Sequence, residues 1–380
     1  MIRPDVLASD RPYGPWGSRA CDVWDTFLAA EAGDAPALLR LLARDPNLAR
    51  AEYWYTPPIR VAVREGHVEA ARILLEAGGE PASLIGQDDL VTVARDRGHE
   101  DVALLLEAFR ARPERLGKRA AANPPKSKAA RLGAALHAAA SAGDRARADA
   151  LLAEGADPNF HVDSAGNATY AAKTPEIRAL LFAHGGKLDA FDLVWLGEDD
   201  EVVRRVAADP AEAHSGCGGV FTAACKLGKR DLLIRLLDAG ARVPPVLTAC
   251  RSYLMADPGM LRLLLASGMD PDLPNWQRAS PLHDLCGRDG RRRPQAHRLE
   301  CAGILLDEGA ASSAWDDDYR STPLAWAARS DLADMVELLL ALGAPTNLPD
   351  DPPWATPLAW ANRRGHGLIS NILRRSGATA

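Results

Sequence analysis

The stretch STPLAWAARSDLADMVELLLALGA, residues 321–344, decides the fold of this chain. Thr322 can cap a helix through its hydroxyl, and Pro323 suits the first helical turn, where its missing N–H would lack a partner anyway. A second helix follows with a leucine run at 338–340 on its buried side. Gly343 can then end that helix in the left-handed conformation without a Cβ penalty. The stretch therefore predicts two short helices joined by a turn.

The second half of this unit recurs along the chain as an aliphatic run that leads into a glycine. The glycines that end these runs are Gly78, Gly155, Gly185, Gly240, Gly268, Gly309, Gly343 and Gly377. The last four are separated by 41, 34 and 34 residues, the length of one small supersecondary unit. One such unit cannot bury its own apolar side, so neighbouring units must stack. The pattern predicts an all-α solenoid of helix–turn–helix units.

Residues 321–344 resemble the ankyrin repeat through Thr322-Pro323-Leu324, the pair Ala327-Ala328 and Gly343-Ala344. The same frame recurs at Pro58-Ile59, Leu136-His137, Ser280-Pro281-Leu282-His283 and Thr356-Pro357-Leu358. This resemblance covers most of the chain. It implies an ankyrin-repeat solenoid of roughly ten or eleven units, with short turns or β-hairpin tips between them. The unit that begins near Ala168 is expected to be one turn short.

Departures from the repeat predict the domain organisation. We expect an extended tail at residues 1–20, an N-terminal ankyrin block at 21–108, a basic linker at 109–132 and a C-terminal ankyrin block at 133–380. A basic loop at 287–298 is expected to be inserted in the second block. The linker is either a solvated spacer or a docking site for an acidic partner or nucleic acid, and the loop is either a tolerated insertion or a contact site.

The composition limits which cellular environment and which classes of partner are expected. The 380 residues carry a net charge of -6, which argues against nucleic acid or an anionic membrane as a partner. The six cysteines are sparse, and the N-terminus shows no apolar signal region, as in a cytoplasmic protein. We expect a monomer, because both ends of the array carry capping features.

No sequence motif for catalysis, a cofactor or a metal is recognisable. The nearest approach to a metal set is Cys225, Cys250 and Cys286 with His283. The three cysteines occupy equivalent places in consecutive units, and helices pack about 8–10 Å apart, so they are too far apart to share a zinc ion. We expect no metal, no cofactor and no enzymatic activity.

The resemblance places partner contacts on a concave face built from turn tips and first helices. Aromatic side chains and arginines there have the properties of interface anchors. The candidates are Tyr53, Trp54, Arg64, Glu65, Phe160, His161, Trp276, Gln277, Arg288, Tyr319, Trp326, Arg329, Trp354, Trp360, Arg363 and Arg364. Each tryptophan could instead cover a neighbouring repeat. The leading hypothesis is a protein-binding scaffold, and the alternative is an enzyme or small-ligand protein that uses the groove near His283 and the 287–298 loop.

Overall fold

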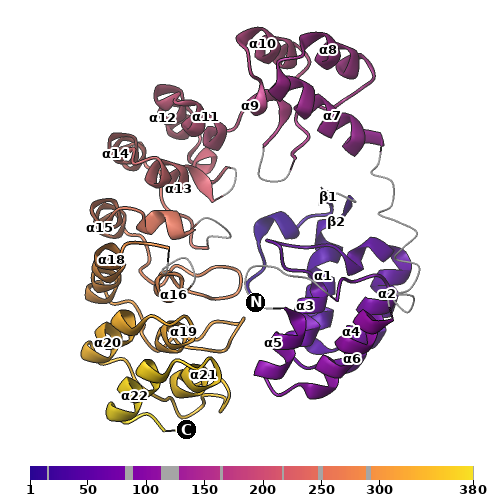
Figure 1. The fold of residues 1–380 in the computed structure, drawn as a ribbon. Coiled ribbons are helices and arrows are strands. Elements are labelled where there is room, and N and C mark those ends of the chain that lie inside the picture. Colours follow the sequence, from indigo (N-terminus) through magenta and orange to yellow (C-terminus); the bar gives the residue numbers. More distant parts are fainter. Residues whose placement is uncertain are drawn as a thin grey trace. The chain divides into compact units, whose positions relative to one another are not determined.

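The computed structural model describes residues 1–14, 17–81, 89–112, 128–162, 166–215, 218–246, 251–287 and 292–379. These residues form two compact units. The N-terminal unit is Arg3–Phe160, and the C-terminal unit is His161–Ala380 together with Met1–Ile2. Both are helical, as Figure 1 shows.

The N-terminal unit consists mainly of antiparallel helix pairs. They are α1 (Ala20–Ala32) with α2 (Ala35–Arg44), α3 (Pro58–Arg64) with α4 (Val68–Glu76), α5 (Leu90–Asp96) with α6 (Glu100–Ala111), and α7 (Lys128–Ala142) with α8 (Arg145–Ala153). The first helices pack in the order α1, α3, α5, and the second helices in the order α2, α4, α6. A 3-10 helix, η2 (Pro46–Ala49), follows α2.

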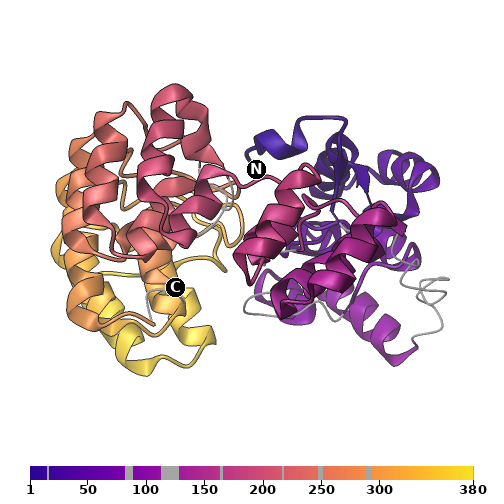
Figure 2. The same ribbon diagram turned by 90° about the horizontal axis from the view of Figure 1, so that it is seen from above.

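The C-terminal unit repeats the same pairing. The pairs are α9 (Ala168–Ala171) with α10 (Pro175–Ala183), α11 (Ala190–Leu196) with α12 (Asp199–Ala208), α13 (Gly219–Lys226) with α14 (Arg230–Asp238), η7 (Arg251–Met255) with α15 (Pro258–Ala266), α16 (Pro281–Cys286) with α18 (Gln295–Asp307), α19 (Pro323–Arg329) with α20 (Ala333–Ala341), and α21 (Pro357–Arg363) with α22 (Gly367–Arg375). The 3-10 helix η6 (Pro210–His214) precedes α13. From α11 onward, the first and second helices form two layers (Figures 1 and 2).

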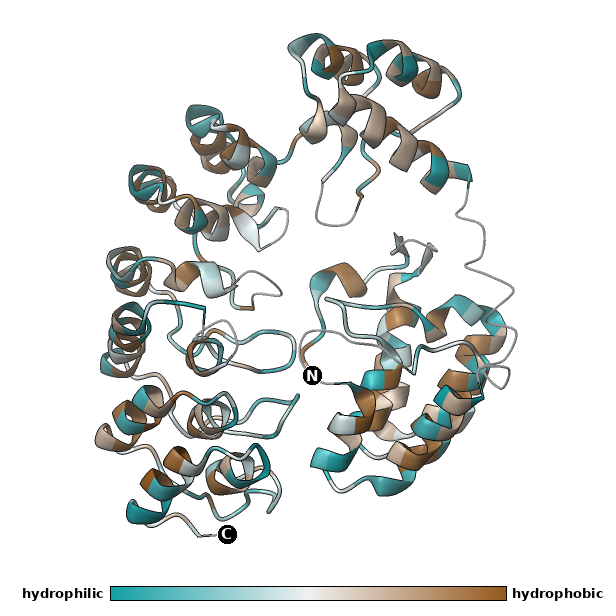
Figure 3. Cartoon of the chain, viewed as in Figure 1, coloured by the Kyte–Doolittle hydropathy of each residue, from teal (hydrophilic) through white to brown (hydrophobic). Residues whose placement is uncertain are grey.

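The chemistry expected of residues 321–344 is present in α19 and α20. The Thr322 hydroxyl accepts a hydrogen bond from the Ala325 N–H at 3.3 Å, and Pro323 opens the helix. Ala327 and Ala328 are fully buried, which allows α19 to pack closely on α16 and α21. Gly343 has φ +85°, the left-handed conformation that ends α20. Figure 3 shows hydrophobic and hydrophilic stretches on the same helices, because one side of each helix is buried.

The segment preceding α1 is not the extended tail expected at residues 1–20. It contains a 3-10 helix, η1 (Asp5–Leu7), and the strands β1 (Pro12–Tyr13) and β2 (Ser18–Arg19), which pair antiparallel. Both η1 and the strands pack against α1, and Leu7 is fully buried. The segment is folded because its contacts with α1 bury apolar surface such as Leu7.

The basic stretches are shorter than the sequence suggested. Helix α6 continues to Ala111 and α7 begins at Lys128, so both ends of the expected linker at 109–132 are helical. Residues 113–127 lie outside the described ranges. The contacts divide the chain after Phe160 rather than within this linker. One physical reason is that the Phe160 ring lies over Gly133 of α7, where an added Cβ would come within 2.3 Å of the ring.

The expected loop at 287–298 is also partly ordered as helix. Residues 288–291 lie outside the described ranges, but α18 already begins at Gln295. Arg298 is buried and bonds to Asp334, while Arg293 donates to the Met255 carbonyl at 2.7 Å. These two arginines therefore tie α18 to its neighbours and do not project into solvent. By contrast, the shortness expected near Ala168 is confirmed, because α9 has only four residues.

Candidate functional site

A row of aromatic rings crosses the last three repeats of the C-terminal unit, and we call it the aromatic row. The ring of His283 meets Trp326 with centroids 5.6 Å apart, and Trp326 meets Tyr319 at 5.3 Å. Tyr319 meets Trp360 at 5.8 Å, and Trp360 meets Trp354 at 6.2 Å. Each contact is edge-to-face, the arrangement that ring quadrupoles favour. The row joins α16, α19 and α21 beneath the turns that precede α19 and α21.

The polar atoms of the row are satisfied within the protein. The Trp360 Nε1–H donates to the Ser321 hydroxyl at 2.9 Å. His283 is fully buried, and its Nδ1 accepts from the Ser280 N–H at 3.0 Å. Its Nε2 then carries the proton and donates to the Ser321 carbonyl at 3.0 Å. Both imidazole nitrogens are therefore engaged in holding two turns together.

Asp316 anchors the turn before α19. Its carboxylate accepts hydrogen bonds from the Tyr319 N–H at 2.7 Å, the Ser321 N–H at 3.2 Å and the Trp326 indole at 2.8 Å. Burial, together with the nearby negative charge of Asp318, raises the pKa of Asp316 to about 6 despite these three donors. The residue holds the turn in shape and is not accessible to a ligand.

Three guanidinium groups surround the buried ring of Trp360. Arg329 lies 4.1 Å from the Tyr319 centroid and 5.1 Å from that of Trp360. Arg363 and Arg364 lie 4.8 Å and 5.8 Å from the Trp360 centroid. These are cation–π distances, and such contacts contribute about 0.5–1 kcal/mol or more each. Trp360 thus orients positive charges that come from both α19 and α21.

The predicted contact residues differ in their accessibility. Six of them are buried and therefore offer no surface to a partner in this structure: Tyr53, Arg64, Trp276, Tyr319, Arg329 and Trp360. Seven are half-buried: Trp54, Glu65, Phe160, Gln277, Trp326, Trp354 and Arg364. His161 and Arg363 are exposed, and Arg288 lies outside the described residues. The buried aromatic residues fill the space between neighbouring repeats because a flat ring packs well against a stacked helix.

Among the described residues of the C-terminal unit, four accessible candidates lie together. Trp326, Trp354, Arg363 and Arg364 lie at the accessible edge of the aromatic row, and we call them the C-terminal surface. The Arg363 guanidinium also donates to the Trp354 carbonyl at 2.9 Å.

In the N-terminal unit, Arg64 serves the fold. Its side chain is 1% exposed, with Nε 2.7 Å from a Glu65 carboxylate oxygen and Nη2 3.4 Å from one of Glu31. The Arg97 guanidinium donates to the Arg64 carbonyl at 2.8 Å. These charges link α1, α3 and the end of α5. The prediction that Arg64 is a surface anchor was wrong, because a paired and buried guanidinium is costly to remove from its partners.

Three accessible turn residues escaped the sequence reasoning. Arg278 and Arg320 have φ of 57° and 46°, and both are exposed at the tips of turns. Tyr55, with φ of 57°, is exposed at the tip before α3. Asn275 signals one of these turns, because its side chain accepts the N–H groups of Gln277 and Ala279. Nothing in the sequence marks which residues adopt the left-handed conformation.

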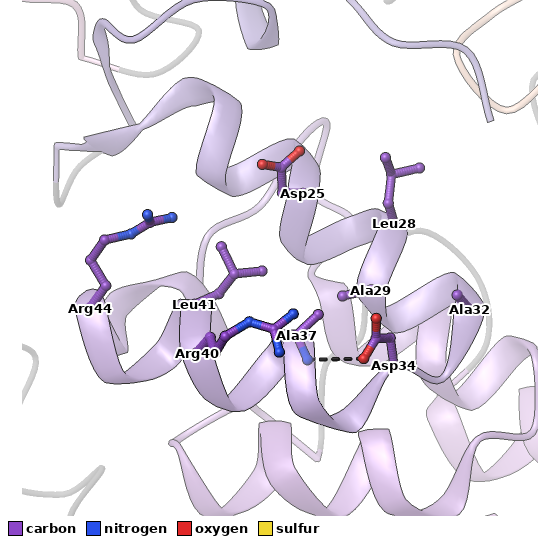
Figure 4. Close-up of a pocket in the computed structure, with 9 residues that line it drawn as sticks. All are labelled: Asp25, Leu28, Ala29, Ala32, Asp34, Ala37, Arg40, Leu41 and Arg44. Atoms are coloured by element: carbon purple, nitrogen blue, oxygen red, sulfur yellow. Dashed lines mark hydrogen bonds between the residues drawn. The ribbon is translucent and has the colours of Figure 1, made fainter.

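Figure 4 shows a hollow of about 500 Å³ between α1 and α2. Leu28, Ala29, Ala32, Ala37 and Leu41 supply its apolar lining, and Asp25, Asp34, Arg40 and Arg44 supply its polar rim. Asp34 caps α2 through the Ala37 N–H, and Arg44 pairs with Asp22 at 2.7 Å. Two of the rim groups are therefore committed to the fold, and the arrangement does not resemble a catalytic constellation.

The described cysteines do not form a metal centre. Cys225, Cys286 and Cys301 are buried, and burial raises the pKa of each thiol. Within the described ranges, no three histidine, cysteine or acidic side chains are grouped so that they could hold a metal ion. Cys250 lies outside those ranges. None of the helices in the described part of the chain has the length and apolar character needed to cross a membrane.

Comparison with known families identifies residues 319–351 as an ankyrin repeat. This segment contains α19 and α20, whose capping and glycine chemistry is described above. The matched repeat and the stacked helix pairs of the described residues are consistent with an ankyrin-repeat protein. No curated protein matches the chain.

Proposed function

We propose that this chain is a non-catalytic scaffold that binds a partner protein through the C-terminal surface. Ankyrin repeats are in general protein-interaction modules, and residues 319–351 are such a repeat. The observation that carries the proposal is the placement of Arg363 and Arg364 over the ring of Trp360, beside the half-buried Trp354. Arginine and tryptophan are the residue types that dominate binding energy at interfaces.

Preorganisation supports this assignment. A free arginine loses rotamer freedom when it binds, which costs about 0.5–1.5 kcal/mol per side chain. Arg363 is already restrained by the Trp360 ring at 4.8 Å and by the Trp354 carbonyl at 2.9 Å. Its side chain is nevertheless exposed, so a partner could meet it with little further ordering.

The alternative of a catalytic groove near His283 has less support. A general base must reach a substrate proton, and His283 is fully buried with both nitrogens hydrogen-bonded to the protein. Arg293 and Arg298, from the neighbouring basic stretch, bond within the fold. We further propose that the scaffold acts as a monomer in the cytoplasm, in keeping with its sparse cysteines.

Affinity capture with a charge-reversed surface tests the proposal. The double variant Arg363→Glu with Arg364→Glu should capture at least about tenfold less partner protein than the wild type, as expected for two interface anchors. The control Arg374→Glu with Arg375→Glu makes the same charge change on α22 of the same repeat, where both side chains are exposed. Circular dichroism should show all proteins equally helical. Equal capture by the two variants would rule out this surface.

A further inference from the structure

The turn before α3 places two aromatic residues in an unfavourable backbone conformation. Tyr53 and Thr56 pair as an isolated antiparallel bridge, with their N–H groups donating to each other's carbonyls at 3.1 and 3.0 Å. Trp54 and Tyr55 between them have φ of 49° and 57°. Positive φ at both central residues is the pattern of a type I′ turn, which strongly prefers Asn-Gly. A Trp-Tyr pair is an unusual choice for this turn.

The two residues with left-handed backbones carry side chains that reach the surface. Non-glycine residues with left-handed backbones are strained, and such residues concentrate at ligand-binding sites. The Tyr55 side chain is 55% exposed, and Trp54 is only half-buried. Tyr53 is buried and supports the tip from below, with its ring 6.5 Å from Trp54 and 6.3 Å from Tyr13. The turn thus presents the Tyr55 ring and part of the Trp54 ring to solvent, and these two rings meet edge to face with centroids 6.3 Å apart.

The charge beside the tip indicates what the rings would bind. Glu52 precedes the turn and is exposed. Burial and the neighbouring Tyr53 are the larger causes of the raised pKa of the Tyr13 phenol. The Glu52 carboxylate lies close enough to contribute to the same rise. Aromatic faces attract cations, and a carboxylate adds a charge-assisted hydrogen bond. A planar guanidinium can use both, because it stacks on rings and forms paired bonds to a carboxylate.

We propose that Trp54, Tyr55 and Glu52 bind an arginine of a basic segment in a partner protein. Because the two rings are nearly perpendicular, the guanidinium stacks on the face of one and meets the other at its edge of contact, and Glu52 accepts its hydrogen bonds. This contact lies in the N-terminal unit and goes beyond the proposed function, which concerns α19 and α21. The left-handed turn places both rings at the same tip.

The test uses the whole chain and a fluorescent nonapeptide that carries three arginines separated by glycines. The variant Trp54→Asn with Tyr55→Gly has the preferred sequence for this turn, so its unfolding temperature should equal or exceed that of the wild type. Its affinity for the peptide, measured by anisotropy at low salt, should fall at least about tenfold, as expected for two cation–π contacts. Leu39→Asn, which alters an exposed apolar side chain of α2 in the same unit, should leave the affinity unchanged.

Two further measurements separate the possible outcomes. Glu52→Gln should weaken binding and reduce its dependence on salt, while a peptide with glutamine in place of arginine should not bind. Unchanged affinity in the Asn-Gly variant, or equal binding of the glutamine peptide, would overturn the proposal. The variant Arg363→Glu with Arg364→Glu should still bind the peptide, so failure of the proposed function and failure of this inference are distinguishable.

Discussion

Titration of Asp316 provides a quantitative test of how the turn before α19 is held together. The carboxyl is almost completely buried, and its pKa rises from an ordinary 3.8 to about 6. A carboxyl whose pKa is raised in the folded state binds its proton more tightly there than in the unfolded chain. It therefore contributes most to stability below pH 3.8, and this contribution is lost as the pH rises through about 6.

The magnitude follows from the shift. A difference of about two pKa units corresponds to about 3 kcal/mol between the fully protonated and fully ionised limits. Between pH 7 and pH 5 only part of that range is crossed, and linkage gives a gain of roughly 1–1.5 kcal/mol from this residue on acidification. Asp192 in α11 should act in the same direction, because burial also raises its pKa to about 6. The Asp316 contribution must therefore be isolated by substitution.

Urea unfolding at pH 7 and pH 5 isolates this contribution. We expect the stability difference between the wild type and Asp316→Asn to change by roughly 1–1.5 kcal/mol between the two pH values, because asparagine does not titrate. The control Asp200→Asn removes a carboxylate whose side chain is 96% exposed. The reasoning is refuted if the difference is the same at both pH values. In that case the three N–H donors, which favour the ionised form, would outweigh burial.

Two further predictions concern buried groups. Trp360→Ala should lower the free energy of unfolding, measured by urea titration, by about 3–5 kcal/mol. The substitution removes a fully buried ring and its hydrogen bond to Ser321. A loss below about 1 kcal/mol would contradict the packing role. Native protein treated with iodoacetamide should contain unmodified Cys286 and alkylated, half-buried Cys21 when its peptides are analysed by mass spectrometry. Burial raises the pKa of the Cys286 thiol and blocks the reagent's access to it. Rapid modification of Cys286 would show that α16 opens readily.

Local chemistry made the repeat predictable. Thr322, Pro323 and Gly343 act through their own backbone and side chain, so their roles can be read from the sequence alone. The short α9 was also predictable, because a missing helical turn is visible as missing residues. Folding of the segment before α1 was not, since short strands and a 3-10 helix depend on the surface they cover.

Accessibility was the part that the sequence could not supply. Trp326 and Trp360 occur in identical strings, Pro323-Leu324-Ala325-Trp326 and Pro357-Leu358-Ala359-Trp360. Trp326 is half-buried and Trp360 fully buried. Both rings contact Tyr319, but Trp360 also packs against Trp354 and lies beneath three guanidinium groups. Such neighbours are set by stacking and not by the string itself.

The burial of the aromatic row changes how the C-terminal surface would work. Each unit of a solenoid contacts only its neighbours, so a ring shared between α19 and α21 couples the last repeats directly. Trp360 performs this coupling and also attracts Arg363 and Arg364 over its ring. Its contribution to binding would then be indirect, through the orientation of these arginines. Under this arrangement, substitution of Arg363 should weaken partner binding while the helical content stays intact, whereas substitution of Trp360 should lower stability and binding together.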